Sequence, residues 1–346
     1  MSSLIKSIEI GSNVTDRSPA VSIIIPCYRS SGLVAETLGS VFSQDFEDVE
    51  VIVLNDDPDD SDALRIAIEP WKNDIIFIDK VSNDGVCPTR NLGAEHARAD
   101  NLAFLDADDV WHPRFLTELL EFKNSGGYDL AYTDAEAFGL PVVDHPNFLS
   151  ANPAGPDVSR DQLIRGECHI LPSGTIVSAE IFRRSGGFDK AVHRSEDFDL
   201  YMRLMFAGAK FGYLRKLLFK FRLRPGSGTG DTLQRIARCR DVWVHLRERL
   251  PFNADELATV ARNIAMEEAA LARAEGRVAI YRNEWKIARE RFQTALAAAF
   301  QLGLPFIHKA KIAAILAGLA LAPSAVRSMM VRSRPNEVAH MPSSTR

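Results

Sequence analysis

The sequence has 346 residues, which is enough for one large α/β domain with a smaller appendage or for two medium domains. Hydrophobic residues make up 46% and charged residues 25%, a mix that excludes collagen-like, low-complexity and wholly disordered chains. Lys and Arg number 41 against 46 Asp and Glu, and the net charge of −5 leaves no overall basic field to hold nucleic acid. The four cysteines form no CxxC pair, which argues against a zinc site or a disulfide framework and favours reduced thiols in a cytoplasmic protein.

Two segments of the sequence bear on targeting and membrane insertion. Residues 1–19 are polar and lack the continuous apolar stretch of a secretory signal. Residues 312–322 form an apolar run of eleven residues, whereas a spanning helix needs about 20. We therefore expect a chain that is soluble in the cytoplasm, or attached at most to the cytoplasmic face of a membrane.

Short β-branched runs alternate with helical stretches from residue 21 onward. Strands are predicted at residues 21–25, 49–54, 75–78 and 101–105, with a helix over 30–43 after the first. This alternation is typical of a Rossmann-like α/β fold, with a mixed, mostly parallel sheet flanked by helices. Acidic clusters follow the second and fourth strands, at the strand ends where open α/β sheets bind their ligands.

The composition divides the chain into four predicted parts. They are an N-terminal extension (1–19), an α/β domain (20–230), an α-helical C-terminal region (231–335) and a disordered tail (336–346). The boundary rests on a Gly-rich loop over 224–231, after which Ala, Arg and Glu dominate and Pro is absent from 255–300. A second loop, rich in Pro, Asn and Asp, is predicted over 139–156.

Two aspartates separated by one residue follow the fourth predicted strand. Residues i and i+2 of a strand point to the same side, so Asp106 and Asp108 can face one ligand while Ala107 packs behind them. Carboxylate pairs suit Mg²⁺ or Mn²⁺, ions that proteins usually share with substrate phosphates. The alternative interpretation is a solvated turn, since paired aspartates are common at strand ends.

Two further turns contain polar residues of a similar kind. Asn55 and Asp56 end the second predicted strand, and they either accept hydrogen bonds from a nucleobase or ribose or merely close the loop. Asn83 and Arg90 flank the start of a helix, where Arg90 either binds a diphosphate or is a surface charge. The spacing is neither GxGxxG nor GxxxxGK, which disfavours dinucleotide-binding and P-loop sites.

A third candidate is the acidic first turn of a predicted helix. Ser195 is placed to cap this helix, and Glu196 and Asp197 follow it. Acidic residues in a first turn stabilise the helix dipole by about 0.3–1 kcal/mol each, which is a purely structural interpretation. The functional alternative is that one of the two is a general base.

Seven motifs occur in one order along the chain. They are Pro26-Cys27-Tyr28, a helix closing on Ser40 to Gln44, Glu50 to Asp56, Asn83-x-Gly85 with Arg90-Asn91-x-Gly93, Phe104 to Asp109, Gly186 to Asp189, and Glu196 to Leu200. Over residues 20–225 this set closely resembles the family 2 inverting glycosyltransferases of the GT-A fold. The resemblance implies a metal-dependent hexosyltransferase that moves a sugar from a nucleotide-diphosphate donor to a glycan or lipid-linked acceptor, in polysaccharide or glycoconjugate biosynthesis.

The resemblance also implies a role for each candidate residue. Asp197 would be the catalytic base, with Glu196 the less favoured candidate. Asp108 would hold Mn²⁺ or Mg²⁺, supported by Asp106. Nine residues would contact the nucleotide sugar, namely Pro26, Tyr28, Asn55, Asp56, Asn83, Arg90, Asp106, Arg222 and Arg224. Asn55 stands where an Asp is common in the family, and its amide leaves the identity of the donor base open.

Two other classes of protein remain as alternatives. A non-catalytic scaffold with this fold would bind a glycan or a partner through its helical region, but it would tend to lose one of the acidic motifs, and both are present. A nucleotidyltransferase would carry a Gly-rich loop with Arg and Lys after the first strand. The segment Pro26-Cys-Tyr-Arg-Ser differs from such a loop.

The C-terminal apolar run also has two interpretations. Lys309 and Lys311 precede it and arginines follow it, a pattern that predicts peripheral contact with an anionic membrane surface. The alternative is that the run supplies the buried stripe of a helix docked on the catalytic domain, at Ile312, Ile315, Leu316 and Leu319.

Overall fold

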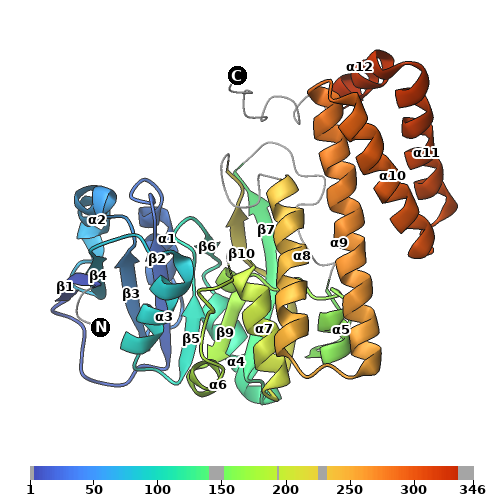
Figure 1. Cartoon of the computed structure of the whole chain (residues 1–346). Coiled ribbons are helices and arrows are strands. Elements are labelled where there is room, and N and C mark those ends of the chain that lie inside the picture. Colours follow the sequence, from blue (N-terminus) through green and yellow to red (C-terminus); the bar gives the residue numbers. More distant parts are fainter. Residues whose placement is uncertain (1–3, 140–151, 193–194, 225–231, 334–346) are drawn as a thin grey trace. The chain divides into compact units, whose positions relative to one another are not determined.

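The computed structural model describes residues 4–139, 152–192, 195–224 and 232–333. The chain divides into two compact units, Met1–Ser227 and Gly228–Arg346. Most of the loop predicted over 139–156, the segment 225–231 and the predicted 336–346 tail lie outside the described residues. Figure 1 follows the chain through both units.

The first unit is built on one mixed sheet. Its strand order is β1-β4-β3-β2-β5-β9-β7-β10-β6, with β8 paired to β10. The strands are β1 (Ile5–Ile10), β2 (Val21–Cys27), β3 (Val49–Asn55), β4 (Ile75–Lys80), β5 (Asn101–Phe104), β6 (Val110–Trp111), β7 (Leu130–Phe138), β8 (Asp157–Val158), β9 (Thr175–Ser178) and β10 (Phe211–Arg222). The four predicted strands are confirmed as β2 to β5, and β4, β3, β2 and β5 pair in parallel.

Antiparallel strands complete the sheet at both sides of this parallel set. Strand β9 lies between β5 and β7 and is antiparallel to both, whereas β7 and β10 are parallel. Strand β1 pairs antiparallel with β4 and forms an edge of the sheet. Part of the predicted N-terminal extension therefore belongs to the sheet.

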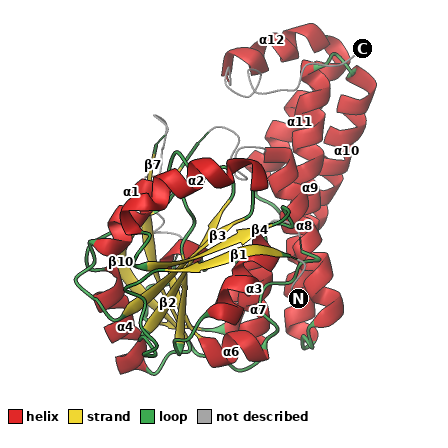
Figure 2. Ribbon diagram, turned by 90° about the vertical axis from the view of Figure 1, so that its left-hand side faces the viewer, coloured by secondary structure: helices red, strands yellow, loops and turns green. Residues whose placement is uncertain are grey.

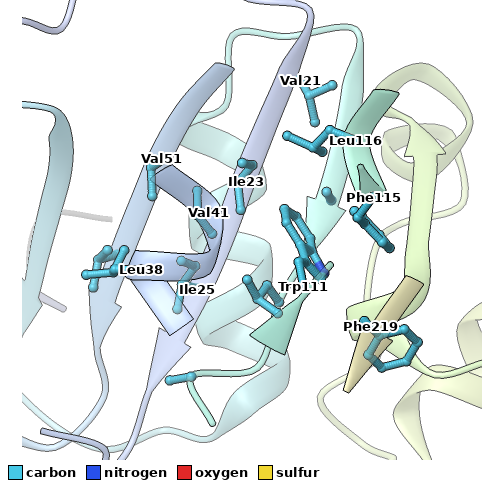
Figure 3. Packing of buried hydrophobic residues seen from close by; sticks show 14 of the residues in the cluster. Val21, Ile23, Ile25, Leu38, Val41, Val51, Trp111, Phe115, Leu116 and Phe219 are labelled. Carbon is cyan, nitrogen blue, oxygen red and sulfur yellow. The ribbon is translucent and has the colours of Figure 1, made fainter. Parts of the chain in front are cut away.

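Helices cover both faces of the sheet. They are α1 (Val34–Phe42), α2 (Ser61–Ile68), α3 (Val86–His96), α4 (Phe115–Gly126), α5 (Arg160–Ile164), α6 (Ala179–Arg184) and α7 (Glu196–Phe206), with 3₁₀ turns at Pro58–Asp60, Glu69–Trp71 and Pro172–Gly174. Alternate residues of β2 and β3, such as Ile23, Ile25 and Val51, direct their side chains to one face of the sheet. Helices α1, α2 and α4 pack on that face (Figure 3). Figure 2 shows α3 on the opposite face from α1 and α2.

The packing of α3 requires a glycine. A Cβ at Gly93 would lie 2.4 Å from Cγ2 of Ile24 and 3.1 Å from Cδ1 of Leu54, closer than carbon atoms pack. Gly93 thus lets α3 approach β2 and β3 closely, and this sets where the first turn of α3 meets the strand ends.

The second unit is helical, as predicted. Its helices are α8 (Thr232–Arg249), α9 (Ala254–Tyr281), α10 (Trp285–Gln301), α11 (Phe306–Leu321) and α12 (Pro323–Ser333). Ile312 and Leu319 are buried in the core of this unit, and Ile315 and Leu316 pack against it. The run therefore supplies a buried stripe, but one that packs within the helical unit itself, and its docking on the catalytic domain stays a prediction. Within the described residues, no helix combines the length and the apolarity needed to cross a membrane.

Candidate active site

The acidic turns predicted from the sequence meet at one edge of the sheet. Strands β3, β2 and β5 are parallel neighbours, so their carboxyl ends point the same way. Asp56 follows β3, and its backbone N–H donates to the carbonyl of Cys27 at the end of β2 (2.7 Å). Asp106 and Asp108 follow β5, across β2 from this turn.

A buried lysine holds the Asp56 carboxylate. Lys80, at the end of β4, has a side chain only 1% exposed, with Nζ 2.5 Å from Oδ1 of Asp56 and 2.7 Å from Oγ1 of Thr89. It also pairs with Asp84. Burial raises the pKa of Asp56, and Lys80 offsets part of that rise. The carboxylate is thereby fixed through Oδ1, and its predicted contact with the nucleotide stays a prediction.

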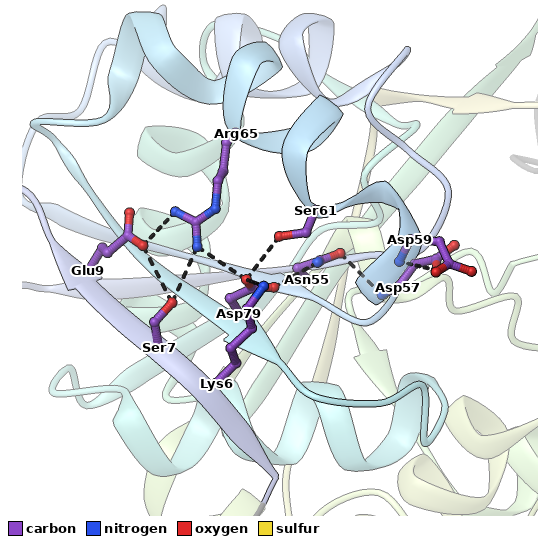
Figure 4. A network of polar contacts seen from close by, with 9 residues as sticks. All are labelled: Lys6, Ser7, Glu9, Asn55, Asp57, Asp59, Ser61, Arg65 and Asp79. Carbon is purple, nitrogen blue, oxygen red and sulfur yellow. Dashed lines mark hydrogen bonds and ion pairs between the residues drawn. The ribbon is translucent and has the colours of Figure 1, made fainter.

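Asn55 is bound within a polar network beneath this turn (Figure 4). Its Nδ2 donates to Oδ1 of Asp79 (2.8 Å), and its Oδ1 accepts from the backbone N–H of Asp57 (3.1 Å). Burial alone would raise the pKa of Asp79, but hydrogen bonds led by those from Asn55 and Ser61 lower it below its usual value. Both polar atoms of Asn55 thus have partners in the protein, and direct contact with the donor base stays a prediction.

Three other predicted contacts for the nucleotide lie around the same edge. Pro26 is half-buried in β2, and the Tyr28 side chain is exposed, with the Arg29 guanidinium 5.2 Å from its ring centre. Asn83 is exposed, and its Oδ1 accepts from the N–H of Gly85 (3.0 Å), which shapes the turn into α3. Of these residues, only Tyr28 presents a large flat surface on which a base could stack.

Arg90 joins two motifs that are far apart in the sequence. Its side chain is 4% exposed, and its Nη2 donates to Oδ1 of Asp106 (2.5 Å) while Nη1 donates to Oε1 of Glu196 (2.9 Å). The guanidinium lies 5.1 Å from the ring centre of Phe188. Burial alone would lower the pKa of Arg90, but Asp106 and Glu196 raise it above its usual value. Arg90 is therefore a buried, charged link between the two acidic motifs, not a surface charge.

The region after β5 is a compact group of carboxylates. Asp109 is buried, where its Oδ2 accepts from Oγ of Ser173 (2.6 Å) and its Oδ1 accepts from the N–H of Arg222 (2.9 Å). Burial and the charge of Asp106 raise its pKa well above the usual value. Asp109 thus fixes the loop, while Asp106 and Asp108 are half-buried and closer to solvent.

Arginines from the end of β10 lie against Asp108. Nε of Arg224 lies 2.8 Å from Oδ2 of Asp108, and Nε of Arg222 donates to the backbone carbonyl of Asp108 (2.7 Å). Arg222 also pairs with Glu36 and lies over the ring of Phe138. The two predicted diphosphate-binding arginines are therefore beside the predicted metal-binding residues.

The donor set fits a divalent cation that is completed by substrate oxygens. Within the described residues, no group of three or more His, Cys, Asp and Glu side chains is arranged to hold a metal by itself. Burial and the neighbouring charge of Asp106 raise the pKa of Asp108, so the two carboxylates repel each other. A divalent ion relieves such repulsion, and Mg²⁺ or Mn²⁺ is commonly held by one or two carboxylates together with phosphates.

The acidic pair at the start of α7 divides into two different environments. Glu196 is paired with Arg90, whereas Oδ1 of Asp197 accepts from the backbone N–H of Phe198 (2.8 Å). Burial, followed by the charge of Glu196, raises the pKa of Asp197 from 3.8 to about 7. Ser195, just before α7, has a φ of 134°, a strained conformation of the kind that clusters at functional sites. Asp197 is therefore the member of this acidic pair whose pKa lies near neutral pH.

Comparison with known proteins assigns the family. Residues 22–182 match the family model described as Glycosyl transferase family 2. Residues 22–182 therefore form a glycosyltransferase family 2 domain. One relative, an uncharacterized glycosyltransferase of Rickettsia felis, is 24% identical over 234 residues, which cover 65% of this chain and 38% of the relative. Chondroitin synthase of Escherichia coli is 27% identical over 228 residues, covering 65% and 32%. The chain thus matches just over a third of the first relative and just under a third of the second.

Solved structures share the fold of this chain. S. aureus TarS 1-349 aligns with a TM-score of 0.60 and 17% identity, over 91% of each chain. The mannosyltransferase PcManGT from Pyrobaculum calidifontis, in complex with GDP-Man and Mn²⁺, aligns with a TM-score of 0.59 and 16% identity, over 94% of this chain and 89% of that one. The expected GT-A fold is confirmed.

The Gly186 to Asp189 motif supports α7 in this family 2 domain. Arg203 binds Asp199 through Nε (2.8 Å) and Nη2 (2.7 Å), and it donates to the carbonyls of Ser185 and Gly187. Gly187 has a φ of 68°, and a Cβ there would lie 2.6 Å from Oδ1 of Asn91. The turn is therefore fixed between α3 and α7, the two helices that supply Arg90 and the acidic pair.

Sequence reasoning missed two residues of this family 2 site. Lys80 orders Asp56, and Ser173 donates to Asp109 while accepting from the N–H of Asp106 (3.1 Å). The signal for Lys80 was present, because Asp79-Lys80 ends a parallel strand at the same edge as the other polar turns. Ser173 precedes the antiparallel strand β9, and its neighbour across the sheet could not be read from sequence.

Proposed function

We propose that this chain transfers a sugar from a nucleotide-diphosphate donor to a hydroxyl of a glycan or lipid-linked acceptor, with inversion at the anomeric carbon. The observation that carries the proposal is Arg90, which binds both Asp106 and Glu196 and so joins the strand-end aspartates to the acidic turn that contains Asp197. Burial, which raises the pKa of Asp197 to about 7, supports a general base at this position. A general base is most effective when its pKa is close to the working pH. Family membership supports the same reaction class.

The proposed reaction is a single displacement. The acceptor hydroxyl oxygen forms a bond to the anomeric carbon from the face opposite the diphosphate, and Asp197 accepts the hydroxyl proton. The bond from the anomeric carbon to the diphosphate oxygen breaks, and its electron pair leaves with the diphosphate. General-base assistance of this kind is typically worth about 10²–10⁴-fold in rate.

Asp108, supported by Asp106, would hold Mn²⁺ or Mg²⁺ when the donor is bound. The ion would neutralise charge that develops on the leaving diphosphate. Arg224 and Arg222, which lie against Asp108, are placed to add positive charge at the same point. The Mn²⁺ in the PcManGT complex supports a divalent ion in this fold.

Asp56 and Tyr28 are the proposed nucleoside contacts. Lys80 holds Oδ1 of Asp56, so Oδ2 would accept from the base or the ribose, and the exposed Tyr28 ring would stack on the base. TarS has been solved in complex with UDP-GlcNAc and PcManGT with GDP-Man, so both bases belong in the search for the donor. The names of two relatives, chondroitin synthase and the succinoglycan biosynthesis protein ExoO, support a role in polysaccharide biosynthesis.

A panel of UDP- and GDP-sugars tests this function. A ligand that binds the native state raises the melting temperature, so at least one nucleotide sugar should do so, and more strongly with Mn²⁺. The same donor should then release its nucleotide when glycan acceptors are added. A panel in which none of these donors shifts the melting temperature would contradict the proposal, and binding without turnover on any acceptor would favour a non-catalytic scaffold.

A further inference from the structure

Helix α11 is apolar on two opposite faces. One face supplies Ile312 and Leu319 to the core of the helical unit. The other exposes large side chains at both ends of the helix, with Phe306 84% exposed, Ile307 59% and Leu321 87%. Alanines at positions 310, 313, 314, 317 and 320 lie between them. At 100° per residue these eight positions fall in one stripe about 140° wide, opposite the buried stripe.

Basic residues border the exposed stripe. The same helical geometry puts Lys309 just beyond one side of the stripe and Lys311 just beyond the other. Lys309 also lies 4.9 Å from the ring centre of Phe300, whose side chain is exposed at the end of α10. Residues 302–333 contain four Lys and Arg and no Asp or Glu, although the whole chain has a net charge of −5. This segment is therefore locally basic in an acidic protein.

We propose that the exposed stripe of α11 binds the surface of an anionic lipid membrane, with the helix lying in the plane of the interface. A helix that is apolar all round is normally covered all round, and within the described residues this stripe is open to solvent. The 16 residues of α11 are too few to span a bilayer but enough to lie on it. The lysine stems would extend along the apolar stripe and carry their ammonium groups to acidic headgroups.

The charge bordering the stripe favours an anionic membrane over a second copy of the chain as its binding partner. In a symmetric dimer through the stripe, the same patch would face itself, and Lys309 and Lys311 of each copy would approach the lysines of the other. Like charges across an interface oppose association. An anionic membrane meets the same lysines with opposite charge. The inference concerns binding alone and does not depend on the transfer reaction.

Flotation of the full chain with vesicles tests the proposal. Wild-type protein should float with vesicles of phosphatidylcholine and phosphatidylglycerol, and much less with phosphatidylcholine alone. Lys309→Gln with Lys311→Gln should lower the partition coefficient by about fivefold per lysine, and Phe306→Ser with Leu321→Ser should remove most of the bound fraction. Phe306, Leu321 and Lys311 are exposed and Lys309 is only half-buried, so circular dichroism and melting temperature should remain as in the wild type.

Matched controls come from the neighbouring helix α10. Lys286→Gln and Ile287→Ser change an exposed cation and an exposed apolar side chain outside the stripe, and both variants should float as the wild type does. Absence of wild-type flotation, or equal flotation of wild type and stripe variants, would overturn the proposal. A lipid-free dimer that Phe306→Ser with Leu321→Ser dissociates would overturn it in favour of a second copy.

Discussion

Arg90 and Glu196 form a buried ion pair between residues 106 positions apart, with Nη1 2.9 Å from Oε1. The other terminal nitrogen of Arg90 binds Asp106 (2.5 Å), so one guanidinium connects the strand-end aspartates to the acidic turn of α7. This ion pair places the two neighbouring acidic residues of α7 in different electrostatic environments. Glu196 is paired with a cation, while burial, followed by the charge of Glu196, raises the pKa of Asp197 to about 7, and Arg90 offsets part of that rise.

The first prediction concerns the pH dependence of the reaction. Asp197 must be deprotonated to accept a proton, so kcat/KM should increase with pH through about 7 and then level off. Initial rates at subsaturating acceptor between pH 5 and 9 measure this limb. A profile that is flat across pH 5 to 8, with chemistry limiting, would show that no group of raised pKa acts as the base.

The second prediction concerns Arg90 as a positioning residue. Because Arg90 lowers the pKa of Asp197 and neutralises Glu196, Arg90→Met should raise the pKa of Asp197 and move the acidic limb to higher pH. Arg90→Lys keeps the charge and should restore part of the shift. Arg98→Met is the control, since it removes another partly buried ion pair, with Glu50 (2.7 Å), away from α7. An equal shift in both Met variants would mean that the effect is merely structural.

The third prediction concerns the metal. Asp108→Asn should remove most of the Mn²⁺-dependent part of donor affinity and leave folding intact, because Asp108 is half-buried and its predicted role is to bind the ion. Isothermal titration of the donor with and without Mn²⁺ measures the difference. Asp62→Asn, an exposed aspartate in the first turn of α2, should behave as the wild type. A variant at Asp108 that keeps the full Mn²⁺ dependence would refute the assignment.

The fourth prediction links Asp197 to stability. Its native pKa of about 7 lies above the ordinary value of 3.8, so between these values the native state binds more protons than the unfolded state. Stability from this group is present below about pH 4 and is lost as the pH rises towards 7. Asp197→Asn should therefore raise the melting temperature at pH 8 more than at pH 5. The same gain at both values would show that Asp197 is not perturbed in the native state.

The parallel half of the fold was predictable because its signals are local. The apolar runs of β2 to β5 are buried on both faces, and each is followed by a polar turn. The prediction for the third strand stopped at residue 78, whereas β4 continues through Asp79 and Lys80. Charged residues argue against a buried strand. Here burial is tolerated because Asp79 binds Asn55, Ser61 and Arg65, and Lys80 binds Asp56.

Other features depend on contacts that sequence order does not reveal. Strand β1 has a mostly exposed, alternating sequence and is a strand because β4 offers an edge. The candidate carboxylates could be named from their motifs, but the difference between Glu196 and Asp197 could not, since it depends on Arg90 from a distant helix. Two apolar faces on α11 were likewise hidden in a single apolar run, because burial of one face and exposure of the other is a property of the packed unit.

The most direct test of the central claim compares Asp197→Asn with the wild type on the identified donor. The substitution keeps the shape of the side chain and removes the base, so kcat should fall by about 10²-fold or more while the Kd for the donor stays within about twofold. Glu196→Gln, measured in parallel, should cost less in kcat. A mild effect of Asp197→Asn on kcat, together with a large loss of kcat in Glu196→Gln, would contradict the account and make Glu196 the base.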